Sequence, residues 1–246
     1  MIDKYKILGL IPARGGSKGV KKKNLVKIHN KSLTEWALIN LIKTKYIDKI
    51  IVSTDNDEIY NLVNSIGEYT PFKRPKEFAL DESKSIDVIK HALDFENKNN
   101  RFYDFIVLIE PSCPFRTPNQ IEQCLEMISA NPEITSVVSL VEVEDNHPIR
   151  MKKILPTGKI IPYLDAEPEG LRRQDQEKIY IRNGGVYVFN SKKIKKDILY
   201  GDNVHGLIVD RNKFGFNIDS EMDYELSKII ADKMKNKYRL KEILPI

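Results

Sequence analysis

The stretch Lys6-Ile7-Leu8-Gly9-Leu10-Ile11-Pro12 is a short apolar run that leads into a basic loop, Arg14-Gly15-Gly16-Ser17-Lys18-Gly19. Its length and its Ile and Leu content are typical of a strand buried on both faces of a parallel sheet. Similar runs return at 50–53, 105–109, 137–141 and 185–189. Because amphipathic stretches separate them, the pattern predicts right-handed βαβ units. We therefore expect an α/β fold with a mainly parallel, Rossmann-like sheet and helices on both faces.

Capping sequences mark three helix starts. They are Ser32-Leu33-Thr34-Glu35, Thr117-Pro118-Asn119-Gln120 and Ser220-Glu221-Met222-Asp223. In each, a hydroxyl oxygen and a side chain three residues later can satisfy free amides of the first helical turn. Ligands of open α/β sheets lie beyond the carboxyl ends of the strands, so the loops between these elements are where we expect a site.

The bulk composition is that of an ordinary globular protein. The chain has 246 residues, of which 41% are hydrophobic and 30% charged, and a formal net charge of +5. This length suffices for one core, so we expect a single domain over 1–246. No apolar run approaches the roughly 20 residues of a membrane helix. Residues 1–6 also lack the apolar stretch of a secretory signal, which favours a cytoplasmic location.

Two further features bear on the organisation of the chain. From about residue 144 to residue 182 the sequence turns polar, with short strand-like pieces, and we interpret this range as an insertion that forms a small β-rich arm. Cys113 and Cys124 have a spacing that fits neither a zinc site nor a redox motif, so we expect structural roles for both.

The loop after the first apolar run favours phosphate binding. Its glycines let the backbone approach an anion closely. Arg14 offers a planar charged fork, and Lys18 and Lys23 offer point charges. The loop matches neither the Walker sequence nor the dinucleotide-binding glycine motif. The alternative is a flexible surface turn with incidental lysines, which its place directly after a buried strand disfavours.

This loop, followed by Lys23-Asn24, resembles the signature of the acylneuraminate cytidylyltransferases, the CMP-sialic acid synthetase family. Five further stretches resemble that family's motifs in the same order: Val52-Ser53-Thr54-Asp55; Arg74-Pro75 with Leu80-Asp81; Glu110-Pro111-Ser112-Cys113-Pro114-Phe115-Arg116; Arg172-Arg173-Gln174-Asp175 with Asn183-Gly184 and Tyr187; and Ile218-Asp219 with Asp223. The resemblance implies a nucleotidyltransferase fold and transfer of CMP from CTP to an acidic nine-carbon sugar, with Mg²⁺ and a homodimer held by the 144–182 arm.

The resemblance also implies roles for individual residues. The catalytic residues are Arg14 and Lys23. The nucleotide-binding residues are Ala13, Gly15, Gly16, Ser17, Asn24, Asp81 and Ser85. The sugar-binding residues are Glu110, Arg173, Gln174, Asn183 and Tyr187, with Arg173 on the sugar carboxylate. The metal-binding residues are Asp219, Asn217 and Asp223. Structural alternatives stay open for several of them: a helix cap for Asp81, a plain sheet position for Tyr187 and a turn for Asp219.

Two positions depart from the family pattern. Asn217 stands where the family usually has the first aspartate of an Asp-x-Asp pair, so metal affinity is expected to be lower unless Asp223 or a water substitutes. Glu110 replaces a glutamine, and a carboxylate attracts an amine or a hydroxyl. This substitution favours a legionaminate- or pseudaminate-type sugar over plain N-acetylneuraminate.

Other functions remain as alternatives. Asp55-Asn56-Asp57 follows a buried strand, as the metal motif of a glycosyltransferase would. A cytidylyltransferase for a 3-deoxy-octulosonate or a polyol phosphate would share the phosphate loop. The basic loop could also bind nucleic acid, although the other lysines are scattered along the chain. We expect CTP and an acidic sugar as partners, and neither nucleic acid nor a membrane.

Overall fold

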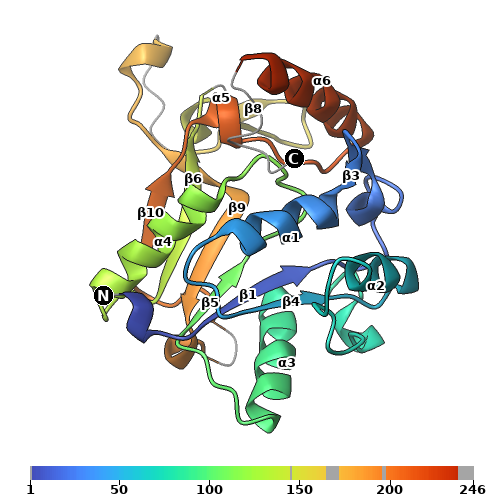
Figure 1. The fold of residues 1–246 in the computed structure, drawn as a ribbon. Helices are drawn as coiled ribbons and strands as arrows, with labels where there is room; N and C mark the ends of the chain where they lie inside the picture. The colour runs from blue at the N-terminus through green and yellow to red at the C-terminus, as the bar shows by residue number, and fades with distance from the viewer. Residues whose placement is uncertain (1, 145, 165–171, 196–197, 238–246) are drawn as a thin grey trace.

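The computed structural model describes residues 2–144, 146–164, 172–195 and 198–237 (Figure 1). A six-stranded central sheet has the order β10-β6-β9-β5-β1-β4. Its strands are β1 (Ile7–Pro12), β4 (Lys49–Ser53), β5 (Phe105–Leu108), β6 (Ser136–Glu142), β9 (Tyr180–Asn190) and β10 (Val204–Ile208). The sequence predicted all of these strands except β10.

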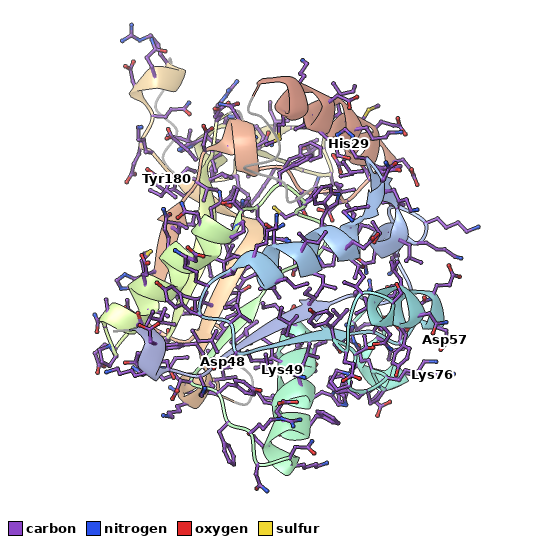
Figure 2. All side chains as sticks on the ribbon, viewed as in Figure 1. His29, Asp48, Lys49, Asp57, Lys76 and Tyr180 are labelled. Carbon is purple, nitrogen blue, oxygen red and sulfur yellow. The ribbon has the colours of Figure 1, made fainter. Side chains whose placement is uncertain are left out.

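The sheet is mainly parallel, as predicted. Strand β1 pairs in parallel with β4 and β5, and β10 pairs in parallel with β6. Strand β9 lies between β5 and β6 and is antiparallel to both. Its first residues therefore lie at the same edge of the sheet as the carboxyl ends of its neighbours. Tyr180 marks this edge in Figure 2, and Asp48 and Lys49 mark the opposite one.

Helices cover both faces of the sheet (Figure 1). Apolar residues of α1 (Leu33–Lys43), α2 (Asp57–Asn64) and α4 (Pro118–Ala130) share one core cluster with residues of β1, β4 and β5. Apolar residues of α3 (Ser85–Lys98) pack in a second cluster, together with the side chains of β1, β4 and β5 that point to the opposite face of the sheet. Two further α-helices follow late in the chain, α5 (Arg211–Phe214) and α6 (Glu221–Lys237). Two short strands, β2 (Lys27–Ile28) and β3 (Lys31–Ser32), precede α1. Single 3₁₀ turns are η1 (Ile2–Lys4), η2 (Lys23–Leu25), η3 (Lys76–Phe78) and η6 (Ser191–Lys193).

The predicted capping sequences form as expected. The Ser32 hydroxyl accepts from the Glu35 amide at 3.2 Å, and the Glu35 carboxylate accepts from the Ser32 amide at 2.7 Å. Thr117 and Gln120 make the same reciprocal pair at the start of α4. These bonds satisfy amides that the first helical turn would otherwise leave unpaired, which is why each helix begins directly after its capping residue.

The predicted insertion contains a small antiparallel sheet. It is the hairpin of β7 (Lys152–Ile154) and β8 (Ile160–Pro162). The insertion also contains the 3₁₀ turns η4 (Pro148–Arg150) and η5 (Arg173–Asp175). Ile154 is 77% exposed and Ile160 59% exposed, so the hairpin adds little to the core. In Figure 1 the η5 end of the insertion projects away from the sheet.

An irregularity interrupts the pairing of β6 with β9. Val138 pairs with Tyr187 and Leu140 with Arg182, so residues 183–186 of β9 all lie opposite the single residue Ser139. We call residues 183–186 the β9 bulge. The bulge lies at the edge of the sheet where the parallel strands have their carboxyl ends. There it interrupts the regular pattern in which successive side chains of β9 point to opposite faces of the sheet.

The two cysteines, Cys113 and Cys124, are buried, and neither forms a disulfide. Within the described ranges, no helix is long and apolar enough to cross a membrane.

Candidate active site

A cavity of about 420 Å³ opens beyond the carboxyl ends of β1, β4 and β5. Four segments that are far apart in sequence line it: the glycine-rich loop after β1, the segment from Arg74 to Ser85 after β4, the loop after β5, and Asp219 before α6. Parallel strands bring these segments together because their carboxyl ends share one edge of the sheet.

The glycine-rich loop is held in place by its own polar groups. The Gly15 amide donates to the Asp55 carboxylate at 2.8 Å, and the Asn24 side chain donates to the Arg14 carbonyl at 2.8 Å. Gly19 packs so tightly that a Cβ at this position would overlap the backbone carbonyl of Asp219. The third glycine therefore brings the loop against the segment that precedes α6.

Two cations of the loop converge on one carboxylate. Arg14 Nη1 lies 3.0 Å and Lys18 Nζ 2.9 Å from the two oxygens of Asp81, and Arg14 also donates to the Leu80 carbonyl at 2.8 Å. The hydrogen bond from Lys18 lowers the pKa of the Asp81 carboxyl, so Asp81 is an anion at neutral pH. The side chain occupies the place between the two cations that a phosphate group could take.

Arg74 anchors the wall of the cavity that carries Asp81. Its side chain is buried, and it donates from Nε to Ser53 Oγ at 2.9 Å and from Nη2 to the Ser53 carbonyl. Burial lowers the pKa of the Arg74 guanidinium to about 10, which still leaves it charged at neutral pH. These bonds tie the segment from Arg74 to Ser85 to the end of β4.

A second cavity, of about 520 Å³, adjoins the first. Asn183, Tyr187 and Asn217 line it, and Glu110 lines both cavities. Burial raises the pKa of the Glu110 carboxyl, although Arg116 and Lys23 oppose the shift. Tyr187 also packs in the core, where its ring lies 6.4 Å from that of Phe189, so it is both a sheet residue and a cavity residue.

The β9 bulge is organised around Ser139. The Ser139 hydroxyl bonds to Asn183 Oδ1 at 2.6 Å and accepts from the Val186 amide at 2.8 Å. Gly184 has a φ of +72°, a left-handed conformation that glycine adopts without strain. Arg116 Nε donates to the Gly185 carbonyl at 2.7 Å and Nη2 donates to the Glu110 carbonyl, which joins the bulge to the loop after β5.

Asp219 lies between a lysine and an amide. Its Oδ1 is 3.1 Å from Lys23 Nζ, and its Oδ2 accepts from Asn217 Nδ2 at 2.5 Å. Asp223, in contrast, uses one oxygen to accept from the Asp219 amide and from the amide and hydroxyl of Ser220. Asp223 thus caps α6, while Asp219 presents its carboxylate to the first cavity.

A metal ion could be held only in part by side chains of the described residues. They contain no group of three or more His, Cys, Asp and Glu side chains suited to a metal. Magnesium, however, is commonly bound by one or two carboxylates together with substrate phosphates. Asp219 at the rim of the first cavity fits that mode, whereas Asn217 turns its nitrogen, a donor, toward Asp219.

The structure brings most of the predicted site residues together. Those that line the first cavity are Arg14, Gly16, Ser17, Lys23, Asn24, Asp81, Ser85, Glu110 and Asp219. Those that line the second are Glu110, Asn183, Tyr187 and Asn217.

Five predicted residues lie elsewhere. Ala13 is buried in the core, because it continues β1 and donates its amide to the Ser53 carbonyl at 2.9 Å. Gly15 turns its amide to Asp55 instead of the cavity, and Asp223 caps α6. Arg173 and Gln174 lie in η5, on the projecting arm.

Three residues that support the site were absent from the predicted set. Arg74 and Arg116 lie within the motifs quoted above, so their position in those motifs was the available signal. Ser139 had a different signal, because it is a polar residue inside the apolar run Val137-Val138-Ser139-Leu140-Val141. A hydroxyl buried in a strand needs a partner, and here the partner is the β9 bulge.

The acidic pair after β4 has structural roles. Asp55 accepts from the Gly15 amide, and Asn56 caps α2 by accepting from the Ile59 amide at 3.0 Å. Asp57 lies on the outside of the molecule, in the first turn of α2, where it pairs with Lys73 (Figure 2). Each of these three residues is thus engaged with a partner of its own.

Known proteins resemble this chain over nearly its whole length. A pseudaminic acid cytidylyltransferase from Campylobacter jejuni subsp. jejuni serotype O:23/36 is 27% identical, over 92% of this chain and 96% of the relative. A CMP-N,N'-diacetyllegionaminic acid synthase from Campylobacter jejuni subsp. jejuni serotype O:2 is 29% identical, over 94% and 96%. Among solved structures, a CMP:2-keto-3-deoxy-manno-octonic acid synthetase complexed with CTP shares the fold, with a TM-score of 0.66, 16% identity and coverage of 93% and 99%.

A family model described as cytidylyltransferase matches residues 8–198, which include the glycine-rich loop, the Arg74 wall, the Glu110 loop and the β9 bulge. On this match, the chain belongs to the cytidylyltransferase family.

Proposed function

We propose that this cytidylyltransferase activates an acidic nine-carbon sugar, a nonulosonate. The sugar's anomeric hydroxyl would attack the α-phosphorus of CTP, giving the CMP-sugar and pyrophosphate. The observation that carries the proposal is the junction of a cation-lined cavity and a second cavity at Glu110. Two adjoining cavities can hold the reacting groups of two substrates in contact. The sugars in the names of the two relatives are both of this class.

The phosphate chain of CTP would lie against Arg14, Lys18 and Lys23. These side chains and the loop amides neutralise charge that accumulates on the departing pyrophosphate, which is how such transfers are accelerated. Asp81 now pairs with Arg14 and Lys18, so the triphosphate would displace it. The opposite wall, with Phe78, would face the nucleoside.

We propose Mg²⁺ as the metal, with Asp219 as its protein ligand. The ion would supply positive charge to the substrate's phosphate oxygens. Lys23 now pairs with Asp219 and would move from the carboxylate toward a phosphate. A ligand role for Asn217 would require its amide to turn, because its nitrogen faces Asp219.

The proposed assembly is a homodimer held by the arm. Ile154 and Ile160 place exposed apolar side chains on the β7–β8 hairpin, and a second copy could cover them. Arg173 and Gln174 lie on the same arm, away from the cavities of their own chain, so a contact with sugar would come from the partner copy. Light scattering on wild type and on an Ile154→Asp, Ile160→Asp variant tests this, and a monomeric wild type would contradict it.

The experiment that tests the function is pyrophosphate release from CTP and Mg²⁺ with a panel of sugars. The panel contains N-acetylneuraminate, N,N'-diacetyllegionaminate, pseudaminate and a 3-deoxy-octulosonate. We expect turnover with at least one nine-carbon sugar and a loss of about 10²–10³-fold in kcat for Arg14→Ala. Lys43→Ala, which removes an exposed cation at the far end of α1, is the control and should retain activity.

Two other outcomes would change the proposal. Turnover with the octulosonate alone would support the proposed nucleotidyl transfer but show that the sugar substrate has eight carbons instead of nine. Absence of turnover with the whole panel, by a protein that binds CTP, would contradict the proposed substrate class.

A further inference from the structure

Arg116 places a charged side chain inside the protein. The residue is 1% exposed, and burial lowers the pKa of its guanidinium. Its Nη1 is buried and has no hydrogen-bond partner among the described residues. A buried charge and a buried unpaired donor both cost free energy, so an apolar side chain of similar length would fill this place at a lower cost. Stability alone therefore does not account for an arginine here.

The two hydrogen bonds of Arg116 reach segments that belong to different cavities. Nε donates to the Gly185 carbonyl at 2.7 Å, and Nη2 donates to the Glu110 carbonyl. Glu110 begins the loop after β5, and residues 110–112 line the first cavity. Gly185 belongs to the β9 bulge, whose residues 183–184 line the second cavity. One guanidinium thus connects a wall of each cavity.

The connection is rigid at both ends. The Nε–H and Nη2–H bonds lie side by side on one planar group, so the two carbonyl oxygens that they hold have a fixed separation. Arg116 itself directly precedes Thr117, which begins α4 through its reciprocal bonds with Gln120. The relative position of the loop after β5 and the β9 bulge is therefore set by a planar group at the start of a helix.

We propose that Arg116 is a positioning residue for the transfer reaction, which holds the walls of the two cavities at the separation that brings the sugar hydroxyl to the α-phosphorus of CTP. Arg116 lines neither cavity, and it acts through the backbone of Glu110 and Gly185. A misplacement of about 1 Å can cost about 10²-fold in rate, because the reacting atoms must approach within about 3–3.5 Å. This inference rests on the proposed function and adds to it the group that aligns the two substrates.

The first test compares Arg116→Met and Arg116→Lys with wild type in steady-state kinetics. Methionine keeps the length but donates nothing, and lysine keeps the charge but offers a point donor instead of a planar fork. We expect kcat to fall by about 10²-fold in both variants, while the Kd for CTP, from direct titration, changes much less. An unchanged kcat in Arg116→Met, full activity in Arg116→Lys, or a Kd for CTP that rises as much as kcat falls would overturn the inference.

Arg101→Met is the matched control, because Arg101 makes the same kind of fork with a buried residue of α3. Its Nε and Nη2 donate to the two carboxylate oxygens of Glu96 at 2.6 and 3.0 Å, on the side of the sheet where β5 begins. Loss of this fork should lower the Tm and leave kcat unchanged at a temperature where the protein is folded. A fall in kcat equal to that of Arg116→Met would show that destabilisation by itself lowers activity, and would overturn the inference.

A second measurement needs neither a variant nor a sugar, so it decides the question even if the Arg116 variants do not fold. Amide hydrogen exchange is followed on wild type with and without CTP. CTP in the first cavity should slow exchange of the Gly185 and Val186 amides, because Arg116 joins the loop after β5 to the β9 bulge. Strand β10, at the outer edge of the sheet, should not change.

No slowing in the bulge, or an equal slowing in β10, would overturn the positioning role of Arg116. Absence of turnover with every sugar of the panel would contradict the proposed function alone, and the exchange measurement with CTP would still decide the role of Arg116.

Discussion

Replacing Arg74 with methionine should destabilise the protein and weaken CTP binding together. The substitution keeps a long side chain but removes the two bonds to Ser53 that tie the wall of the first cavity to β4. A hydrogen bond from a charged donor contributes about 1.5–3 kcal/mol, so the two bonds amount to roughly 3–6 kcal/mol before the desolvation of the guanidinium is subtracted. Methionine needs no such desolvation, so the net loss should be about 2–4 kcal/mol.

Thermal unfolding measures the first effect and steady-state kinetics the second. For a chain of this length, each kcal/mol lowers the Tm by about 2–4 °C, which predicts a fall of about 5–15 °C. The KM for CTP should rise more than kcat falls, because Phe78 and Ser85 lie on the wall that Arg74 anchors. Lys76→Met, at an exposed position of the same segment, is the matched control (Figure 2). A Tm within 2 °C of wild type and an unchanged KM for Arg74→Met would refute the anchoring role.

Three more predictions concern other parts of the molecule. Asp81→Asn should lower the KM for CTP, because a neutral amide competes less well with the triphosphate for Arg14; a raised KM would instead indicate that Asp81 binds substrate. Gly19→Ala should reduce activity at least tenfold in a folded protein, since the new methyl group must push away the segment of Asp219, and unchanged kinetics would contradict that close approach. Burial opposes ionisation of Glu96, but its bonds from Arg101 outweigh burial and lower its pKa below the usual value. The stability that this bond provides is therefore fully present above about pH 4.5 and is lost as the pH falls through the lowered pKa, so Glu96→Gln should flatten the acid limb of a plot of unfolding free energy against pH.

Much of the fold could be predicted because its signals are local. The apolar runs and the capping sequences at Ser32 and Thr117 each depend on a few neighbouring residues, and the structure confirms them. Strand β10 gave no such signal, since Val204-His205-Gly206-Leu207-Ile208 is a mostly exposed edge strand. The antiparallel direction of β9 was also missed, because direction depends on the path of the chain and not on the composition of the strand.

The site was predicted in outline but not in detail. The motifs identified the segments that meet at the cavity, because those segments follow parallel strands. They could not show which groups turn inward: Gly15 belongs to the loop, yet its amide faces Asp55. The Asp81 contact with Arg14 and the orientation of the Asn217 amide arise from tertiary packing, which has no counterpart in a linear motif.

In a regular strand, the pairing register and the residues that line a neighbouring cavity depend on each other. The β9 bulge separates these two properties. On either side of it, the pairing of Tyr187 with Val138 and of Arg182 with Leu140 keeps the sheet in register. The number of residues between Arg182 and Tyr187 can therefore differ while the pairs on either side keep their partners. Evolution, or a protein engineer, could reshape the floor of the second cavity one residue at a time here and so obtain new sugar preferences from an unchanged sheet.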